Sequence, residues 1–239
     1  MATDADLQMT GTPPLRPGDC HVWWATPNRD WPEGPISPEE QRRHDELMRP
    51  EDRRRFVAGV GLSRLLLGAH SGTSPRKLVI DRGCLRCGQP HGKPRLADPA
   101  TDIEFSVSHA GERVVVALTR GGPVGVDVES LQRRAGVDTL APHVLSLAER
   151  DARGGDDAAR LLRYWTRKEA VLKATGDGLS APMTELTVSP PDQPARVVRW
   201  ASRPDLVSRI VLADLHPGSG YVACVAHFGR GEVHEFHLA

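Results

Sequence analysis

Apolar and polar positions along the chain predict mostly short strands, interrupted by longer stretches with helical spacing. Two long helices are expected at 51–67, ending at Gly68, and from about 156 to Gly176. A shorter helix is expected after Ser37, where a proline and a glutamate complete a capping box, and two more at 136–145 and 146–153. Strands are expected at 21–25, 77–80, 103–107, 113–119, 124–128, 185–188, 195–200, 208–213 and 221–227.

A cluster of helix and strand breakers at 120–123 divides this pattern into two similar parts. Each part has a long helix followed by a run of strands, and the last strands of the two parts resemble each other. We therefore expect an α+β fold of two pseudosymmetric halves, each a small antiparallel sheet packed with a long helix, with an active site at their interface. The expected units are a disordered N-terminal segment at 1–17, a first half at 18–121 and a second half at 122–239.

The charge balance limits the kinds of partner that the protein can attract. Lysine plus arginine and aspartate plus glutamate number 31 each, so no overall field directs the chain to nucleic acid or to a membrane surface. The chain contains no run of 18 apolar residues, and its N-terminus is polar and acidic, unlike a signal peptide. We expect a cytoplasmic protein in which any anion-binding site is local.

Lysine is rare, and its few positions are informative. Only four of the 31 basic residues are lysines; Lys168 and Lys173 lie in the second long helix, and Lys93 lies in a Gly-Lys-Pro turn. Ammonium groups are compact point charges, which suits them to phosphate. Trp165, Glu169 and Lys173 follow one another at four-residue spacing and share one helix face. The alternative interpretation of this Glu–Lys spacing is a surface ion pair.

Three carboxylates complete a candidate site. Asp127 and Glu129 project from the same side of the strand at 124–128, and Glu169 comes from the second long helix. The alternative interpretation of Asp127 and Glu129 is that both are solvated charges at the edge of a sheet. However, carboxylates are ligands that Mg²⁺ prefers. Together with the lysines and the turn at Ser108 they predict metal-assisted chemistry on a phosphate ester. The P-loop, the dinucleotide-binding glycine motif and the serine-hydrolase elbow are all absent from the sequence.

The cysteines do not form a disulfide scaffold, because there are only four in 239 residues. Cys84 and Cys87 have the spacing of a zinc knuckle, and His91 lies nearby. A structural zinc site needs four ligands, and this stretch supplies three. Packed or redox-inert thiols are therefore the favoured interpretation, and zinc binding is left open.

Four motifs in series resemble the 4′-phosphopantetheinyl transferase superfamily, in particular its surfactin-synthetase-activating type, a monomer of two pseudosymmetric halves. They are HGKPRL at 91–96, FSVSHAG at 105–111, GVDVES at 125–130 and WTRKEAVLK at 165–173. The resemblance extends from about residue 53 to the C-terminal strands. Two departures are an alanine after Ser108-His109, where many relatives have serine, and KEA in place of KES in the last motif.

The resemblance implies Mg²⁺-dependent transfer of the 4′-phosphopantetheine of coenzyme A to a serine of an apo acyl or peptidyl carrier protein, with release of 3′,5′-ADP. Coenzyme A would bind to the first half, and the metal and catalytic groups would lie in the second. The matched positions are Asp127, Glu129 and Glu169 for the metal, Glu169 and Lys173 for catalysis, and Arg55, Lys93, Ser108, His109 and Lys173 for coenzyme A.

Several alternatives stay open at this stage. The general base is Glu169 or a metal-bound water, and Glu149 ranks below Glu169 as a contributor. The carrier protein and the choice between Mg²⁺ and Mn²⁺ are undetermined. Two rival functions are a catalytically silent coenzyme A-binding module and an unrelated Mg²⁺-dependent nucleotide phosphohydrolase. Retention of all three carboxylates together with Lys173 argues against the silent module.

Overall fold

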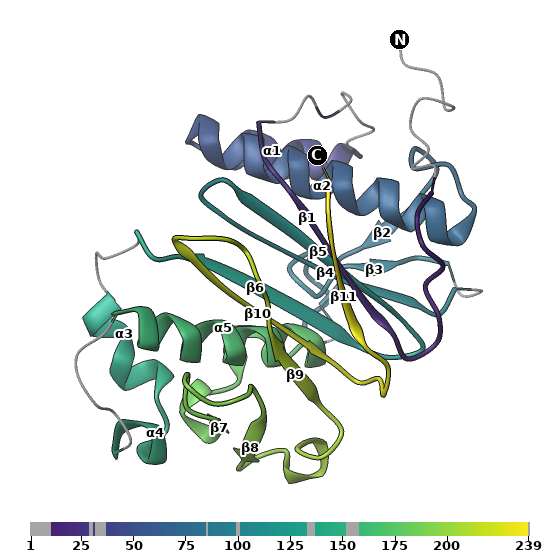
Figure 1. Ribbon diagram of the computed structural model, residues 1–239. Coiled ribbons are helices and arrows are strands. Elements are labelled where there is room, and N and C mark those ends of the chain that lie inside the picture. The colour runs from purple at the N-terminus through teal and green to yellow at the C-terminus, as the bar shows by residue number, and fades with distance from the viewer. Residues whose placement is uncertain are drawn as a thin grey trace.

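Two β-sheets lie between two long helices, so that the body of the protein has four layers (Figure 1). This arrangement confirms the predicted α+β class. The structure is a computed structural model that describes residues 11–28, 31, 37–84, 86–98, 101–132, 137–151 and 158–238.

The first sheet has the strand order β11-β1-β5-β4. Strands β1 (Cys20–Ala25), β5 (Arg113–Arg120) and β4 (Ile103–Ala110) pair antiparallel, and helix α2 (Pro50–Ser71) packs on their outer face. No strand is expected from the sequence pattern after residue 227, yet β11 (Val233–His237) pairs parallel with β1. The end of the chain therefore completes the sheet of the first half. The division of the chain into halves at residue 121 stays a prediction.

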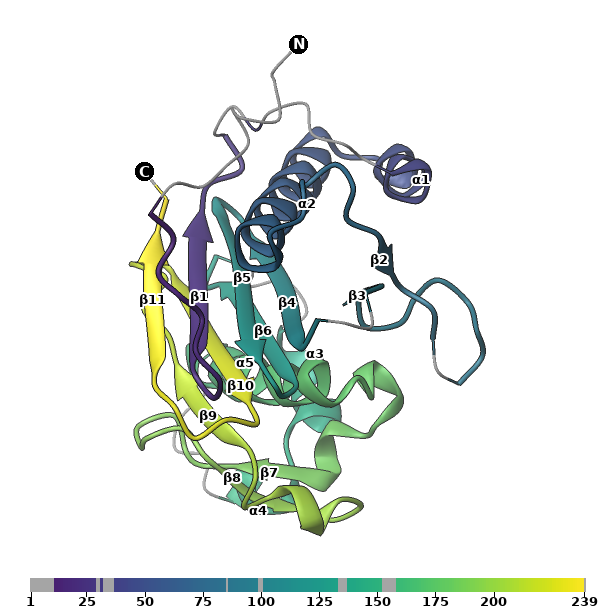
Figure 2. The same ribbon diagram turned by 90° about the vertical axis from the view of Figure 1, so that its right-hand side faces the viewer.

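The second sheet has the order β6-β10-β9 and is antiparallel throughout. Its strands are β6 (Val124–Ser130), β10 (Tyr221–His227) and β9 (Val211–Asp214), and helix α5 (Ala158–Thr175) covers its outer face. Figure 2 shows the strands of the first sheet spread in the order β11-β1-β5-β4, with α2 towards the top of the view and α5 lower down. The predicted strand at 221–227 is confirmed residue for residue; it is a short, nearly continuous apolar run after Gly220, and it is buried on both faces.

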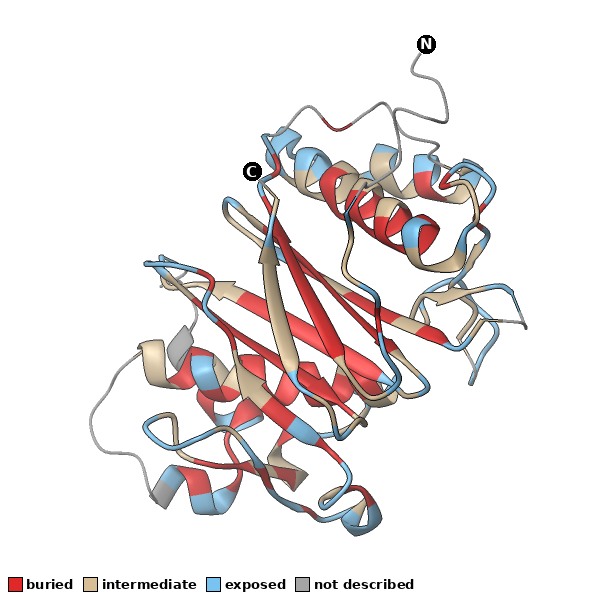
Figure 3. Cartoon of the chain, turned by 45° about the vertical axis from the view of Figure 1, so that its right-hand side comes forward, coloured by how far each residue is buried: buried red, intermediate tan, exposed pale blue. Residues whose placement is uncertain are grey.

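The inner faces of the two sheets share an apolar core, most of it valine and alanine, in the buried central region that Figure 3 shows. The members of this core are Cys20, Val22, Trp24, Val115, Ala117, Val124, Val126, Val128, Leu215, Ala223 and Val225. Strand β6 is an edge strand, and its backbone N–H groups at Val126 and Val128 donate to Ser106 Oγ at 3.1 Å and Ser108 Oγ at 3.4 Å. These bonds fix β6 against β4, which links the two halves.

The contact between α5 and β6 is close because of Gly125. A Cβ atom at this position would lie 2.1 Å from Ala170 O and 2.3 Å from Ala174 N, both of them backbone atoms of α5. Only glycine fits such an approach. The absence of a side chain therefore brings the polar face of α5 next to Asp127.

Helix α2 ends later than the sequence pattern predicts. The predicted stop, Gly68, lies inside the helix and is buried, and a Cβ there would lie 2.9 Å from Thr73 O. The chain instead leaves the helix at Gly72, which has a φ of 72° and donates its N–H to Gly68 O. Gly68 thus serves close packing, and a glycine that serves packing cannot be told from a helix cap by spacing alone.

The remaining elements are short and surround the four layers. The capping box predicted at Ser37 is confirmed, because Ser37 and Glu40 exchange both hydrogen bonds at the start of the first helix. These elements are α1 (Pro38–Glu46), β2 (Ile80–Asp81), β3 (Arg95–Leu96), α3 (Val137–Val144), α4 (Leu147–Asp151), β7 (Leu186–Val188) and β8 (Val197–Trp200), together with short 3₁₀ turns at Gly178–Ser180, Met183–Glu185 and Pro204–Leu206.

The N-terminal segment predicted to be disordered lies partly outside the described residues, which begin at residue 11. Within that segment Leu15 is buried and joins the core under α2, and its carbonyl accepts a hydrogen bond from Arg120. None of the described helices combines the length and the apolar character needed to cross a lipid bilayer.

Candidate active site

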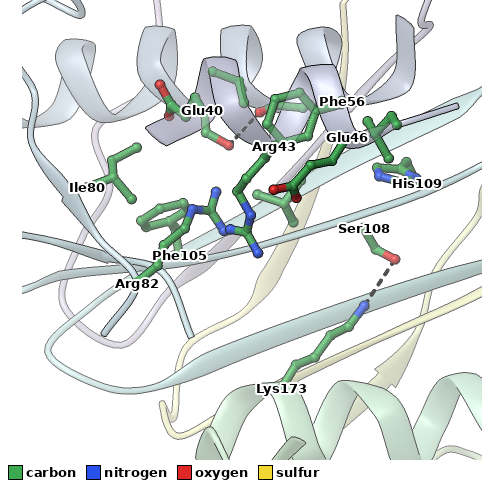
Figure 4. Close-up of a pocket in the computed structure, with 15 residues that line it drawn as sticks. Glu40, Arg43, Glu46, Phe56, Ile80, Arg82, Phe105, Ser108, His109 and Lys173 are labelled. Atoms are coloured by element: carbon green, nitrogen blue, oxygen red, sulfur yellow. Dashed lines mark hydrogen bonds between the residues drawn. The ribbon is translucent and has the colours of Figure 1, made fainter. Parts of the chain in front are cut away.

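A cavity of about 630 Å³ opens between the helices of the first half and the end of α5 (Figure 4). This volume is in the range of small-molecule binding sites. Both halves contribute to its wall, since α1, α2, β2 and β4 supply most of the surface and Lys173 of α5 supplies the rest. The lining residues are Glu40, Arg43, Glu46, Leu47, Phe56, Gly59, Val60, Ser63, Ile80, Arg82, Phe105, Val107, Ser108, His109 and Lys173.

Two arginines meet inside this cavity. Arg43 of α1 and Arg82, which follows β2, extend into the same space and lie side by side in Figure 4. Desolvation and the neighbouring Arg43 cation lower the pKa of the Arg82 guanidinium. Glu40 and Glu39 partly offset this shift, and an anion bound between the two arginines would favour the charged form of Arg82 further. No motif marks these arginines in the sequence, because they are brought together only by the packing of α1 beside β2.

Helix α1 is held in place by a buried ion pair. Arg64 of α2 donates to Glu40 Oε2 at 2.9 Å, and both side chains are almost fully buried. The same carboxylate oxygen accepts the N–H of Ser37 at 2.7 Å. Because Glu40 thereby fixes α1 to α2, the position of Arg43 one turn later is defined by the core rather than by solvent.

The lysine at the other side of the cavity is tied to Asp127. Lys173 Nζ lies 2.6 Å from Asp127 Oδ1, 3.1 Å from Ser108 Oγ and 3.1 Å from Val126 O. Ser108 Oγ also donates to Asp127 Oδ1 at 2.9 Å. Three predicted site residues from β4, β6 and α5 are therefore in direct contact. Lys173 does form an ion pair, but with a carboxylate distant in the sequence.

The carboxylate cluster has the properties of a cation site. Asp127 is buried, and within the described part of the chain its Oδ2 has no hydrogen-bond partner, although Oδ1 has two. Desolvation, then the negative charge of Asp127, raises the pKa of Glu169 to about 7; Lys173 opposes this shift and Glu129 adds to it. A buried unpaired oxygen beside carboxylates that repel each other fits a hard divalent ion such as Mg²⁺. Glu169 thus lies within electrostatic range of both Asp127 and Glu129.

His109 and Arg55 lie on the other side of β4, near the turn into β5. His109 is exposed at the cavity, and partial desolvation together with the charge of Arg55 lowers its pKa. Arg55 donates to Gly111 O at 3.3 Å and to Asp52 Oδ1 at 2.5 Å. Arg55 is not among the residues that line the cavity, so of this pair the structure places only His109 at the wall.

Lys93 is placed close to α5 but is not on the cavity wall. Its ammonium donates to Glu104 Oε2 at 2.8 Å and to Ala174 O at 3.2 Å, and its side chain is 7% exposed. Desolvation lowers the pKa of Lys93. The lysine thus joins β4 to the C-terminal end of α5, where its charge faces free helix carbonyls.

Lys168 does not have the phosphate-binding role that its rarity suggested. Its side chain is fully buried and donates to Val144 O, Glu149 Oε2 and Met183 O at 2.6, 2.6 and 3.0 Å. Glu149 is equally buried and also accepts the N–H groups of Ser146 and Val188. The prediction for Lys168 is wrong, because Lys168 and Glu149 bond to each other and to backbone groups inside the second half. These backbone groups lie at the ends of α3, α4, β7 and the 3₁₀ turn at Met183–Glu185. Glu149 takes part in the same structural network.

The fold and the site together define a class of protein: an α+β protein with a cavity, lined by basic side chains, between two sheet-and-helix layers, and with carboxylates beside it. The chain matches the family model described as the 4′-phosphopantetheinyl transferase superfamily over residues 123–226, from the start of β6 to the end of β10. This range includes Asp127, Glu129, Glu169 and Lys173.

Named relatives extend the match to most of the chain. The 4′-phosphopantetheinyl transferase HetI of Nostoc sp. is 32% identical over 206 residues, which cover 82% of this chain and 80% of that protein. The 4′-phosphopantetheinyl transferase Sfp of Bacillus subtilis is 30% identical over 164 residues, which cover 64% of this chain and 71% of that protein. The chain therefore belongs to the 4′-phosphopantetheinyl transferase superfamily and is an enzyme of its Sfp-like type.

Proposed function

We propose that this enzyme transfers the 4′-phosphopantetheine of coenzyme A to a serine hydroxyl of an apo acyl or peptidyl carrier protein, with Mg²⁺ as the metal. The observation that carries the proposal is the contact of Asp127, Ser108 and Lys173 beside Glu169, at one side of a cavity that Arg43 and Arg82 also line. A polyanion with several phosphates fits this arrangement, because cationic side chains lie on two sides of the same cavity.

Coenzyme A binding follows from the distribution of positive charge. We assign its phosphates to Arg43 and Arg82 in the interior of the cavity and to His109 and Lys173 on the side of the carboxylates. The lowered pKa of His109 leaves the ring largely neutral without ligand, and an adjacent phosphate would favour its protonated form. Arg55 and Lys93 stay proposed contacts just outside the wall. Lys93 would have to leave Glu104 to reach a phosphate.

The metal would be held by Asp127, Glu129 and Glu169. Asp127 Oδ1 is held by Lys173 and Ser108, which leaves Oδ2 as the free ligand atom. When bound, Mg²⁺ supplies neutralisation of the charge on the diphosphate of the substrate. The carboxylate trio offers oxygen ligands and repels itself in the absence of a cation, which favours uptake of the ion.

The chain's own groups then carry out the transfer. Lys173 is placed to stabilise the negative charge that develops on the diphosphate, at a position fixed by its bonds to β4 and β6. Glu169 is the side chain that we assign to accepting the proton of the attacking serine hydroxyl. The serine oxygen forms a bond to the phosphorus that bears pantetheine, the bond to the second phosphate breaks, and 3′,5′-ADP leaves.

The test is the mass of the acceptor. Apo carrier proteins of the peptide-synthetase, polyketide-synthase and fatty-acid types are incubated separately with the enzyme, coenzyme A and Mg²⁺, and each is weighed by mass spectrometry. We expect at least one of them to gain one phosphopantetheine on serine, with no gain in EDTA. Cleavage of coenzyme A without modification of any carrier would favour the phosphohydrolase, and binding without either reaction would favour the silent module.

Arg82 is predicted to contribute to coenzyme A affinity. We expect Arg82→Ala to weaken coenzyme A binding by about 10- to 100-fold, because one charge-assisted hydrogen bond in a desolvated site is lost. Isothermal titration calorimetry of the metal-free protein measures the effect. Arg86→Ala is the matched control, since this arginine lies on the same hairpin and its side chain is 64% exposed. Equal losses in both variants would remove Arg82 from the site.

The monomeric state and the cytoplasmic location expected from the sequence stay predictions, as does the identity of the physiological carrier protein. The balanced charge of the chain supports the expectation that it binds neither nucleic acid nor membrane.

A further inference from the structure

A hairpin outside the cavity brings three metal-binding side chains together. Strands β2 and β3 are joined by residues 82–94, and Figure 2 shows this segment extending away from the sheets. The ligand atoms of Cys84, Cys87 and His91 all lie within 4.8 Å of one another. Cys87 Sγ and His91 Nε2 are 3.0 Å apart. The favoured interpretation of the sequence, packed thiols, does not hold for Cys87, which is exposed.

The backbone around Cys84 has the turn of a metal knuckle. Cys84 donates its N–H to Gln89 O at 2.8 Å, and Gly88 N–H returns to Cys84 O at 2.8 Å with a φ of 73° at Gly88. This turn brings the sulfur of Cys87 back to within 4.8 Å of the sulfur of Cys84.

The base of the turn is equally well defined. Gly92 donates its N–H to Arg82 O at 2.7 Å, and a Cβ at Gly92 would lie 2.5 Å from Gly83 O and 2.9 Å from Cys84 Cα. Glycine therefore allows the two arms of the hairpin to approach until the histidine reaches the cysteines. Such a close approach is needed for the sulfur and nitrogen atoms to share one ion.

The turn has no apolar core of its own, although Ile80 and Leu96 in the two strands pack, partly buried, against the core under α2. Among the described residues between 81 and 98, none is buried. A two-stranded hairpin on its own is marginally stable in water, and small elements without a core depend on a crosslink or a metal. Thiolate and imidazole ligands select borderline or soft ions, and Zn²⁺ is the commonest among proteins with this ligand set.

We propose that Cys84, Cys87 and His91 bind one Zn²⁺ ion, with water in the fourth position, and that this ion holds the hairpin in its folded form. The three side chains supply two sulfur ligands and one nitrogen ligand, and the exposure of the site leaves room for the water. This site is separate from the carboxylate cluster and does not depend on the transfer reaction.

The hairpin contacts both halves of the protein, so an ion bound in it would affect how the two halves are joined. Arg86, within the turn, donates to Ser180 Oγ at 2.8 Å and to Asp177 Oδ1 at 3.3 Å, just beyond the end of α5. Lys93, after the turn, contacts Glu104 and Ala174. An ion at the turn would therefore stabilise a segment that spans from β4 to α5 beside the cavity.

The test is the metal content of the intact protein. The full chain is produced without a histidine tag, kept reduced, equilibrated with Zn²⁺, passed over a chelating resin and analysed by mass spectrometry for metal. We expect close to one zinc per chain in the wild type and almost none in a Cys84→Ser, Cys87→Ser double variant. Gln89→Ala, an exposed change within the same turn, is expected to retain zinc, and His91→Cys is expected to retain it through a third thiolate.

Two further measurements separate the parts of the proposal. Replacement of zinc by Co²⁺ is expected to give a thiolate-to-cobalt charge-transfer band, which the double variant lacks. Hydrogen exchange of the amides at 82–94 is expected to accelerate when zinc is removed. No bound metal in protein whose four thiols titrate as reduced would overturn the site, as would equal metal content in the wild type and the double variant. A disulfide between Cys84 and Cys87 would also overturn it, and unchanged exchange would overturn the stabilising role.

Discussion

Glu169→Gln is expected to abolish phosphopantetheine transfer and, in the absence of metal, to make the protein more stable. Transfer should fall by about 10³-fold or more, because the substitution removes a metal ligand and the proposed proton acceptor with almost no change in shape. A carrier-modification assay under saturating coenzyme A measures this loss. Activity within a few fold of the wild type would remove Glu169 from the site.

The gain in stability follows from the pKa of Glu169. In the folded protein this pKa is raised from its ordinary value of 4.5 to about 7, mainly by desolvation and by the charge of Asp127. The contribution of Glu169 to stability is therefore complete below about pH 4.5 and is lost as the pH rises through 7. At pH 8 the ionised carboxylate costs roughly 3 kcal/mol relative to its protonated form, and glutamine has no such cost.

Thermal unfolding in EDTA measures the stability effect. At pH 8 we expect the Tm of Glu169→Gln to exceed that of the wild type by roughly 5 °C or more, and the difference to shrink toward pH 5. Added Mg²⁺ should raise the Tm of the wild type more than that of the variant. A variant that is less stable than the wild type at pH 8 in EDTA would contradict the assigned electrostatics.

Glu149→Gln is the matched control, because it makes the same change at another buried carboxylate of the same half. Glu149 is held by Lys168 and by two backbone amides, so its charge is compensated. Removal of that charge leaves the buried Lys168 ammonium unpaired and is expected to lower the Tm. The two substitutions thus have opposite predicted signs, which a general effect of glutamine would not produce.

Gly125→Ala is expected to destabilise the protein severely. The new Cβ would lie 2.1 Å from Ala170 O, which is a backbone atom and cannot rotate away, so α5 would have to separate from β6 along its length. We expect a loss of about 3 kcal/mol or more in the free energy of unfolding, with little soluble protein at growth temperature. Urea unfolding of purified protein, followed by circular dichroism, gives the value.

Gly122→Ala tests whether this effect belongs to the helix contact. Gly122 precedes the same strand, but a Cβ there would meet its nearest atom, Phe228 O, at an ordinary distance of 3.4 Å. We expect its unfolding midpoint to stay close to that of the wild type. If the alanine at 125 were tolerated equally well, the close approach of α5 to β6 would be wrong, and with it the placement of Glu169 beside Asp127.

The carboxylates proposed to bind the metal are the part of the site that local spacing predicts best. Residues two apart on a strand share a face, and residues four apart on a helix share a face, so Asp127 with Glu129 and Glu169 with Lys173 form two pairs without any tertiary information. The order of four motifs then indicated which family combines such pairs. These relations depend only on the periods of helix and strand, which the sequence contains in full.

The limits of the sequence are clearest at Lys168 and the two cavity arginines. Lysine scarcity marks Lys168 and Lys173 equally, although the first is buried against Glu149 and only the second reaches the cavity. Arg43 and Arg82 carry no motif, and they meet only because α1 is fixed to α2. Charge type can be identified in the sequence, but the environment that determines its role is formed by segments far apart in the chain.

The amino-acid sequence by itself determined the α+β class, most of the strands, the two long helices and the set of acids and cations that define the family. Only the tertiary structure decided that Lys173 pairs with Asp127, that β11 completes the first sheet and that three ligands meet at the β2–β3 turn. The physical reason is the separation along the chain over which each kind of interaction acts. Periodicity and capping act between neighbours in the chain, whereas ion pairs, sheet order and ligand clusters depend on contacts that form only when distant segments pack.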